Sequence, residues 1–208
     1  MASILHYPIV HHLAEAHECP KLKSVSGITV VTSFTERDKS VLVSQLERSS
    51  INYVNAADGI DVFVKAFKPS YYASALEKVD TEYSLVVDSY DVIINSFEGI
   101  EGVLSSYGKK VIYGAWKIHF PNFIDVDFGS DNDLKYLNSG VVFGRTEDLR
   151  NFYSELSRYT EENFSNGNTL VKDFEQYWIY RFLEENSGWL NDVGIDFNEI
   201  LVTNFSVS

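Results

Sequence analysis

Short β-branched runs alternate with helical segments along this chain, and this alternation constrains its fold more than any other feature. Ile28 to Phe34 (ITVVTSF) and Tyr83 to Val87 (YSLVV) have the continuous apolar character of buried strands. Val41 to Arg48, which lies between them, has helical character. Strands separated by helices of about ten residues form βαβ units. The sequence therefore predicts an α/β fold in which helices flank a mainly parallel central sheet.

The other elements follow from turn and capping signals. Pro69 is suited to the first turn of a helix, and Leu149 begins a run with the 3, 4, 7 spacing of an amphipathic helix. Asn95 with Glu98, and Asp173 with Gln176, have the spacing of capping boxes. We expect strands at about 28–34, 51–54, 83–87, 110–115, 140–143 and 200–205, and helices at about 41–48, 69–78, 95–107, 149–156 and 173–185.

The chain of 208 residues shows no internal repeat and no linker-like tract, which favours one domain. Residues 1–27 are less periodic than the rest. We therefore expect an amino-terminal extension at 1–27 that packs on a domain spanning 28–208.

The net charge is −13, with 17 basic residues against 30 acidic ones. A protein that neutralises phosphates needs a cluster of Lys and Arg, so this balance argues against nucleic acid. It also argues against binding to an anionic membrane surface. An acidic protein can still bind a diphosphate when a divalent cation supplies the positive charge. A nucleotide-binding interpretation of this chain therefore almost requires a metal.

The sequence favours a cytoplasmic protein. Its one cysteine, Cys19, excludes an internal disulfide framework and fits a reducing compartment. The amino terminus lacks a basic segment, and Pro8, His11 and His12 interrupt its apolar stretch, so it is a poor signal peptide. No apolar run has the length that a membrane span needs.

Asp88 and Asp91 lie three residues apart directly after the buried strand YSLVV. Carboxylate oxygens at a strand end can hold Mg²⁺ or Mn²⁺, which keep coordination sites open for phosphates. Tyr90 between them could stack on a base. The alternative is an Asx turn that only caps the strand. Two literal D-x-D triplets, at 125–127 and 131–133, compete for the metal, but both lie in an irregular segment and are expected to be solvated loop acids.

Three segments carry a family resemblance: VVDSYDVII at 86–94, YLNSGVVFG at 136–144 and KDFEQYWIYR at 172–181. In this order and spacing, they resemble the glycosyltransferase domain of the procollagen-lysine hydroxylase/glycosyltransferase family and its viral and bacterial relatives. The resemblance covers about residues 28–205 at low overall identity.

The resemblance implies a GT-A (Rossmann-like) fold, a UDP-sugar donor, and Mn²⁺ (or Mg²⁺) held by Asp88 and Asp91. It also implies donor contacts near the uridine, the base, the sugar and the floor of the site. Thr32 and Ser33 would lie near the uridine, Tyr90 near the base and Trp116 near the sugar. The floor would consist of Asn138, Ser139 and Gly140, and Asp88 would also bind the donor. The LNSG segment has its own physical basis, because a glycine lets the backbone approach a ligand closely. The alternative is a plain turn that enters the next strand.

Asp173 and Glu175 are the candidate catalytic residues by the same resemblance. A carboxylate near the sugar can deprotonate the acceptor hydroxyl or stabilise positive charge at the anomeric carbon. The family has two adjacent Asp residues before the Gln, whereas this chain has Phe174 and Glu175 there, with Asp173 one position earlier. Asp173 also fits a purely structural role as a helix N-cap.

The family supplies a third metal ligand, a histidine, near the carboxyl end of its domain. The sequence has no histidine after His119. Two carboxylates, water and diphosphate oxygens could complete the metal's coordination, with a lower expected affinity. An amino-terminal histidine (His6, His11, His12 or His17) is a possible substitute.

Two functions follow from these observations. The first is a metal-dependent hexosyltransferase that moves a sugar from a UDP-sugar to a hydroxyl acceptor on a glycan, a protein or a small molecule. The alternative is a catalytically impaired GT-A-like module that binds nucleotides or sugars, or has a structural role. An unrelated nucleotide-binding fold is disfavoured, because the sequence contains neither G-x-G-x-x-G nor a P-loop lysine motif.

Overall fold

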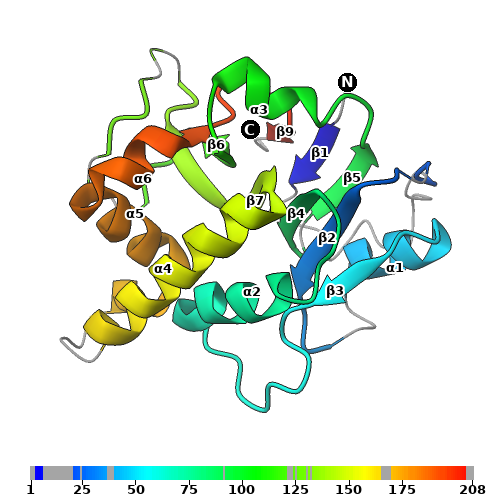
Figure 1. Cartoon of the computed structure of the whole chain (residues 1–208), viewed down its shortest axis with the longest axis horizontal. Coiled ribbons are helices and arrows are strands. Elements are labelled where there is room, and N and C mark those ends of the chain that lie inside the picture. Colours follow the sequence, from blue (N-terminus) through cyan, green and yellow to red (C-terminus); the bar gives the residue numbers. More distant parts are fainter. Residues whose placement is uncertain are drawn as a thin grey trace.

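The computed structural model describes residues 3–6, 21–23, 25–36, 40–90, 92–120, 124, 126–129, 131, 133–164 and 170–204. Helices flank a six-stranded mixed sheet in one α/β domain, as the alternation of the sequence predicts (Figure 1). The strands are β1 Ser3–His6, β2 Ile28–Ser33, β3 Tyr53–Asn55, β4 Tyr83–Asp88, β5 Val92–Ser96, β6 Val111–Trp116, β7 Tyr136–Arg145, β8 Val193–Ile195 and β9 Val202–Asn204. The helices are α1 Val41–Arg48, α2 Lys68–Leu76, α3 Gly102–Tyr107, α4 Thr146–Phe164, α5 Glu175–Glu185 and α6 Ser187–Asp192, with 3-10 turns η3 Lys65–Phe67 and η4 Leu170–Asp173.

The main sheet has the strand order β3-β2-β4-β7-β6-β8. β2 runs parallel to β3 and β4, and β6 runs parallel to β8, whereas β7 is antiparallel to both of its neighbours. The expectation of a mainly parallel sheet is thus confirmed for every strand except β7. β7 follows β6 without an intervening helix in the described residues, and antiparallel neighbours need no helical crossover.

Alternate residues of the strands supply two separate cores. Val31 and Val86 pack with side chains of α2, α4 and α5 on one face of the sheet. Val30 and Leu85, one residue earlier in each strand, pack with side chains of α1 and α3 on the other face. Figure 1 shows α4 lying across the first of these faces, beside α2. The continuous apolar runs predicted for buried strands are explained by this burial on both faces.

A second, three-stranded sheet has the order β5-β1-β9 and corrects one prediction. Asn95 was expected to begin a helix, but it lies within β5, and α3 begins only at Gly102. β5 is held as a strand by antiparallel pairing with β1 and by Gln45. The amide of Gln45 donates to Ile94 O at 2.5 Å and accepts from Ile94 N at 3.0 Å. Tertiary pairing therefore overrides the local capping pattern.

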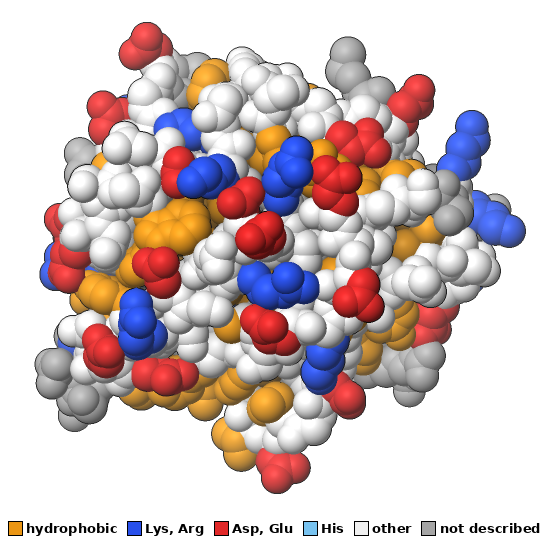
Figure 2. Space-filling view, in the orientation of Figure 1, with side chains coloured by type: hydrophobic (Ala, Val, Ile, Leu, Met, Phe, Trp, Pro, Cys, Tyr) orange, Lys and Arg blue, Asp and Glu red, His pale blue; other side chains and the backbone are white. Residues whose placement is uncertain are grey.

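The described surface shows mixed charge and no membrane-spanning helix. Figure 2 shows acidic and basic side chains interspersed over the face that α4 crosses. The described side chains form no field of one sign on this face. No described helix is both long enough and apolar enough to cross a bilayer.

Substitution of Phe152 tests the packing of the core between the sheet and helices α2, α4 and α5. Phe152 is fully buried in α4, and its ring contacts Tyr113, Tyr153, Phe182 and Trp189 at centroid distances of 5.1–6.0 Å. Phe152→Ala should lower the free energy of unfolding by about 3–5 kcal/mol, because it leaves a cavity among these rings. Urea denaturation followed by circular dichroism measures the change.

The matched control is Asn151→Ala, on the same helix and exposed. It should change the free energy of unfolding by less than about 0.5 kcal/mol. Equal destabilisation by the two variants would contradict the assigned packing of α4.

Candidate functional site

Polar side chains gather at the edge of the sheet where β2 and β4 end. Ser33 and Asp88 are the last residues of these parallel strands and lie opposite each other in the register. Antiparallel β7 starts at the same edge. Its pairing with β4 ends at Val87 and Val141, which places Gly140 level with Asp88. Ligands of α/β proteins bind beyond the carboxyl ends of parallel strands, and this edge is such a place.

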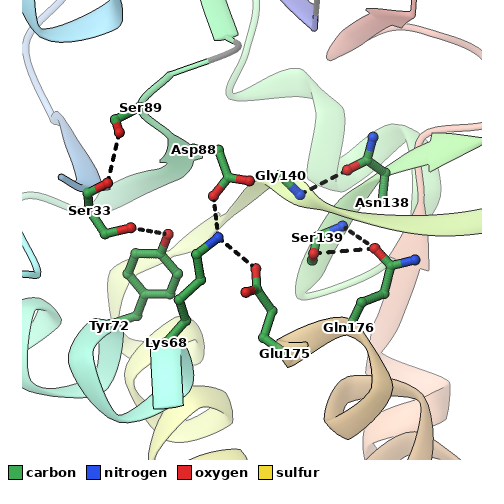
Figure 3. Close-up of polar contacts among 10 residues, drawn as sticks. All are labelled: Ser33, Lys68, Tyr72, Asp88, Ser89, Asn138, Ser139, Gly140, Glu175 and Gln176. Carbon is green, nitrogen blue, oxygen red and sulfur yellow. Dashed lines mark hydrogen bonds and ion pairs between the residues drawn. The ribbon is translucent and has the colours of Figure 1, made fainter. Parts of the chain in front are cut away.

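Lys68 joins two of the predicted site residues. Its Nζ donates to Asp88 Oδ1 at 2.5 Å and to Glu175 Oε1 at 2.9 Å (Figure 3). The side chains are largely buried, with exposed fractions of 11% for Lys68, 26% for Asp88 and 10% for Glu175. We call these three residues the ionic cluster.

The sequence analysis missed Lys68. Its partners lie 20 and 107 residues away along the chain, so no local spacing reveals them. One signal was present in the sequence. A lysine directly before Pro69 at a helix start opposes the helix dipole, and no acidic residue in the first turn offsets it. A cation at such a position indicates a tertiary anion, here supplied by β4 and α5.

Burial and pairing shift the pKa of Lys68, and likewise that of Glu175, in opposite senses. Burial alone would lower the pKa of Lys68, but the carboxylates of Asp88 and Glu175 outweigh it and raise that pKa well above its ordinary value. Burial raises the pKa of Glu175 to about 7, although the positive charge of Lys68 opposes this shift. Lys68 therefore stays charged, while Glu175 exchanges its proton near neutral pH.

The LNSG segment of β7 contacts the start of α5. Ser139 donates to Gln176 Oε1 from its backbone N and from its hydroxyl, both at 3.3 Å. Gln176 Nε2 in turn donates to Phe120 O at 2.6 Å. Within the segment, Gly140 N donates to Asn138 Oδ1 at 2.9 Å (Figure 3). The segment that contains Glu175 is thus tied to the segment that contains Asn138 to Gly140.

Ser33 lies beside the ionic cluster on the same face of the sheet. Its hydroxyl forms a 3.2 Å hydrogen bond with the hydroxyl of Tyr72, one turn after Lys68 in α2. Ser89 Oγ donates to Ser33 O at 2.8 Å and so fixes the chain just beyond Asp88 (Figure 3). Burial raises the pKa of Tyr72 far above its ordinary value, so its phenol stays neutral.

The other predicted donor contacts are placed differently. Tyr90, in the loop after β4, is 41% exposed. Its hydroxyl accepts hydrogen bonds from Thr35 N at 3.2 Å and from Glu36 N at 3.3 Å, which join it to the loop after β2. Thr32 is fully buried, and its Oγ1 has no hydrogen-bond partner among the described residues. Strand alternation points Thr32 to the α1 face, opposite Ser33 and Asp88. Trp116 is half-buried at the same edge, at the end of β6, paired with Tyr136.

The acidic residues considered as catalytic or metal-binding candidates lie in different environments. Glu175 lies in the ionic cluster, whereas Asp173 ends η4 with an exposed side chain. Asp127 accepts a 2.7 Å hydrogen bond from Gly129 N and so caps its own turn, and the side chain of Asp133 is 89% exposed. Asp91, the second predicted metal ligand, lies outside the described residues.

The described residues do not by themselves form a metal site. They contain no group of three or more His, Cys, Asp and Glu side chains arranged to hold a metal ion. Asp88 is paired with an ammonium group, and a cation beside it would meet like charge. Mn²⁺ or Mg²⁺ at Asp88 and Asp91 stays a prediction.

No protein-family model fits this chain, and no curated protein is significantly similar to it. The family resemblance of the three segments therefore stays a prediction.

The pKa of Glu175 can be tested through stability. Folding raises this pKa from 4.5 to about 7, so the folded state binds the proton more tightly than the unfolded state. The contribution of Glu175 to stability is therefore complete below pH 4.5 and is lost as the pH rises through 7. Relative to Glu175→Gln, the wild type should lose up to about 3 kcal/mol of unfolding free energy over this interval. Urea denaturation of both proteins from pH 4 to 8 measures the difference, and a difference that does not change with pH would contradict the raised pKa.

Proposed function

We propose that this protein transfers a sugar from a nucleoside-diphosphate sugar, a UDP-sugar by the resemblance, to a hydroxyl group of an acceptor. The observation that supports this most is the meeting of the three resembling segments at one edge of the sheet. Asp88, the segment 138–140 and Glu175 come from distant parts of the chain. Asp88 and Glu175 meet at Lys68, and Ser139 contacts Gln176, the residue that follows Glu175. An incidental resemblance of sequence would not require these segments to converge.

In this proposal the donor lies across the carboxyl ends of β2 and β4. The exposed ring of Tyr90 offers a surface on which a base can stack. Asp88 and Ser33 lie next to it on the face covered by α2, where the diphosphate and sugar would follow. Thr32, on the opposite face, would support the strand rather than contact the donor.

Glu175 is the proposed catalytic carboxylate. When the acceptor oxygen bonds to the anomeric carbon, the bond from that carbon to the diphosphate oxygen breaks, and its electron pair leaves with the diphosphate. The acceptor proton must then be removed, and a carboxylate with a pKa of about 7 is matched to this task at neutral pH. The same carboxylate could instead offset positive charge at the anomeric carbon. The stereochemistry of the product distinguishes these two roles.

The acceptor would approach over the aromatic side chains next to Glu175. Phe174 is 40% exposed, and its ring meets that of Phe120 edge-on at 5.5 Å. Lys65 Nζ lies 5.5 Å from the centroid of the Phe174 ring. An aromatic residue at a helix N-cap position satisfies no backbone N–H. Such a departure from local preference is expected where a residue serves a ligand.

One observation favours a second candidate, a module that binds a nucleotide or sugar without turnover. Lys68 already pairs with both Asp88 and Glu175, the two carboxylates that the chemistry needs. The altered acidic pair at 174–175 agrees with this alternative.

A donor-hydrolysis assay over a panel of UDP-sugars, with and without Mn²⁺, tests the proposal. Glu175→Gln should reduce turnover by about 10²- to 10⁴-fold, the usual contribution of a positioned acid or base, while UDP binding is retained. Glu162→Gln is the matched control, because it makes the same change at an exposed glutamate of α4 outside the ionic cluster. It should keep wild-type turnover.

Turnover that falls equally in both variants would remove Glu175 from the chemistry. A wild type that binds UDP but hydrolyses no donor would favour the second candidate. A wild type that binds no UDP in either buffer would refute both.

A further inference from the structure

Lys68 pairs with one of the two carboxylates at which the sequence predicts a divalent cation. Its Nζ lies 2.5 Å from Oδ1 of Asp88, the described member of the predicted metal pair. A metal ion bound to that oxygen would lie within a few ångströms of a buried ammonium, and the two cations would repel each other. The chain itself thus places one positive charge beside Asp88.

The ammonium of Lys68 retains capacity for a ligand. A lysine carries three N–H donors, and Nζ makes two hydrogen bonds with the described residues, one to Asp88 and one to Glu175. One donor therefore remains for a phosphate oxygen. Asp88 is the most exposed member of the ionic cluster, so a ligand would reach Nζ from the side of β4.

Two helix N-termini add positive potential at the same point. α2 begins at Lys68 and α5 begins at Glu175, and both helix starts lie at the ionic cluster (Figure 3). Each N-terminus carries roughly half a positive charge. Together with Lys68 they offset the two carboxylates, so a diphosphate would not meet a net negative site.

We propose that this site binds a nucleoside diphosphate without a divalent metal, and that Lys68 is the fixed cation that contacts the phosphate. This inference rests on the proposed function, because it identifies the group that receives the donor's diphosphate. It departs from the metal-dependent site that the resemblance implies.

UDP titrated into the protein by calorimetry, once in chelator and once with Mn²⁺, tests the inference. The wild type should bind UDP in chelator, with an affinity that Mn²⁺ does not raise. Lys68→Met should weaken UDP binding by about 10- to 100-fold, the usual effect of losing a hydrogen bond to a charged group. Lys78→Met, which removes the same charge from an exposed position just beyond the far end of α2, should bind as the wild type does.

UDP binding that appears only with Mn²⁺ would overturn the inference and leave the proposed function standing. Equal binding by the wild type and Lys68→Met in chelator would also overturn it. No binding in either buffer would refute the inference and the proposed function together.

A second pair of variants covers the case in which Lys68→Met does not fold because two carboxylates stay buried without a cation. Lys68→Met with Glu175→Gln removes one charge of each sign and keeps the formal charge of the ionic cluster. Compared with Glu175→Gln alone, this double variant should show the same 10- to 100-fold loss of UDP affinity in chelator. Equal affinity of the two would overturn the inference.

Discussion

The two ion pairs of the buried Lys68 ammonium hold the candidate site together. Lys68 joins α2 to β4 through Asp88 and to α5 through Glu175. A buried charge without a partner is strongly destabilising, typically by about 3–5 kcal/mol. The pairing therefore fixes the distance between the strand end and the helix start. It also sets the protonation of Glu175, because the charge of Lys68 opposes the effect of burial on that pKa.

The sheet brings these groups together through its strand directions. β2 and β4 end at one edge, and β7 starts there because it is antiparallel to both of its neighbours in the main sheet. The reversal places Asn138, Ser139 and Gly140 beside Asp88. A parallel strand in that position would have carried its first residues to the opposite edge. The antiparallel strand, which the sequence did not predict, is therefore what puts LNSG at the candidate site.

The sequence predicted the elements that depend on local pattern and missed the features that depend on distant contacts. The limits of α1 and the buried strands β2 and β4 follow from apolar periodicity. The prediction of a helix that begins at Asn95 is wrong, because pairing with β1 holds this segment as strand β5. The two paired segments lie about ninety residues apart in the chain. Lys68 was missed for the same reason. The position of Thr32 could have been predicted, because strand alternation lets only one of Thr32 and Ser33 share a face with Asp88.

In the proposed site, Asp88, Lys68 and Glu175 lie at the diphosphate of a nucleotide-sugar. A crystal structure of the protein grown with UDP in chelator tests this arrangement. A phosphate oxygen should lie within hydrogen-bonding distance of Lys68 Nζ, with the uracil near Tyr90. UDP bound away from the carboxyl ends of β2 and β4, with the ionic cluster untouched, would contradict it.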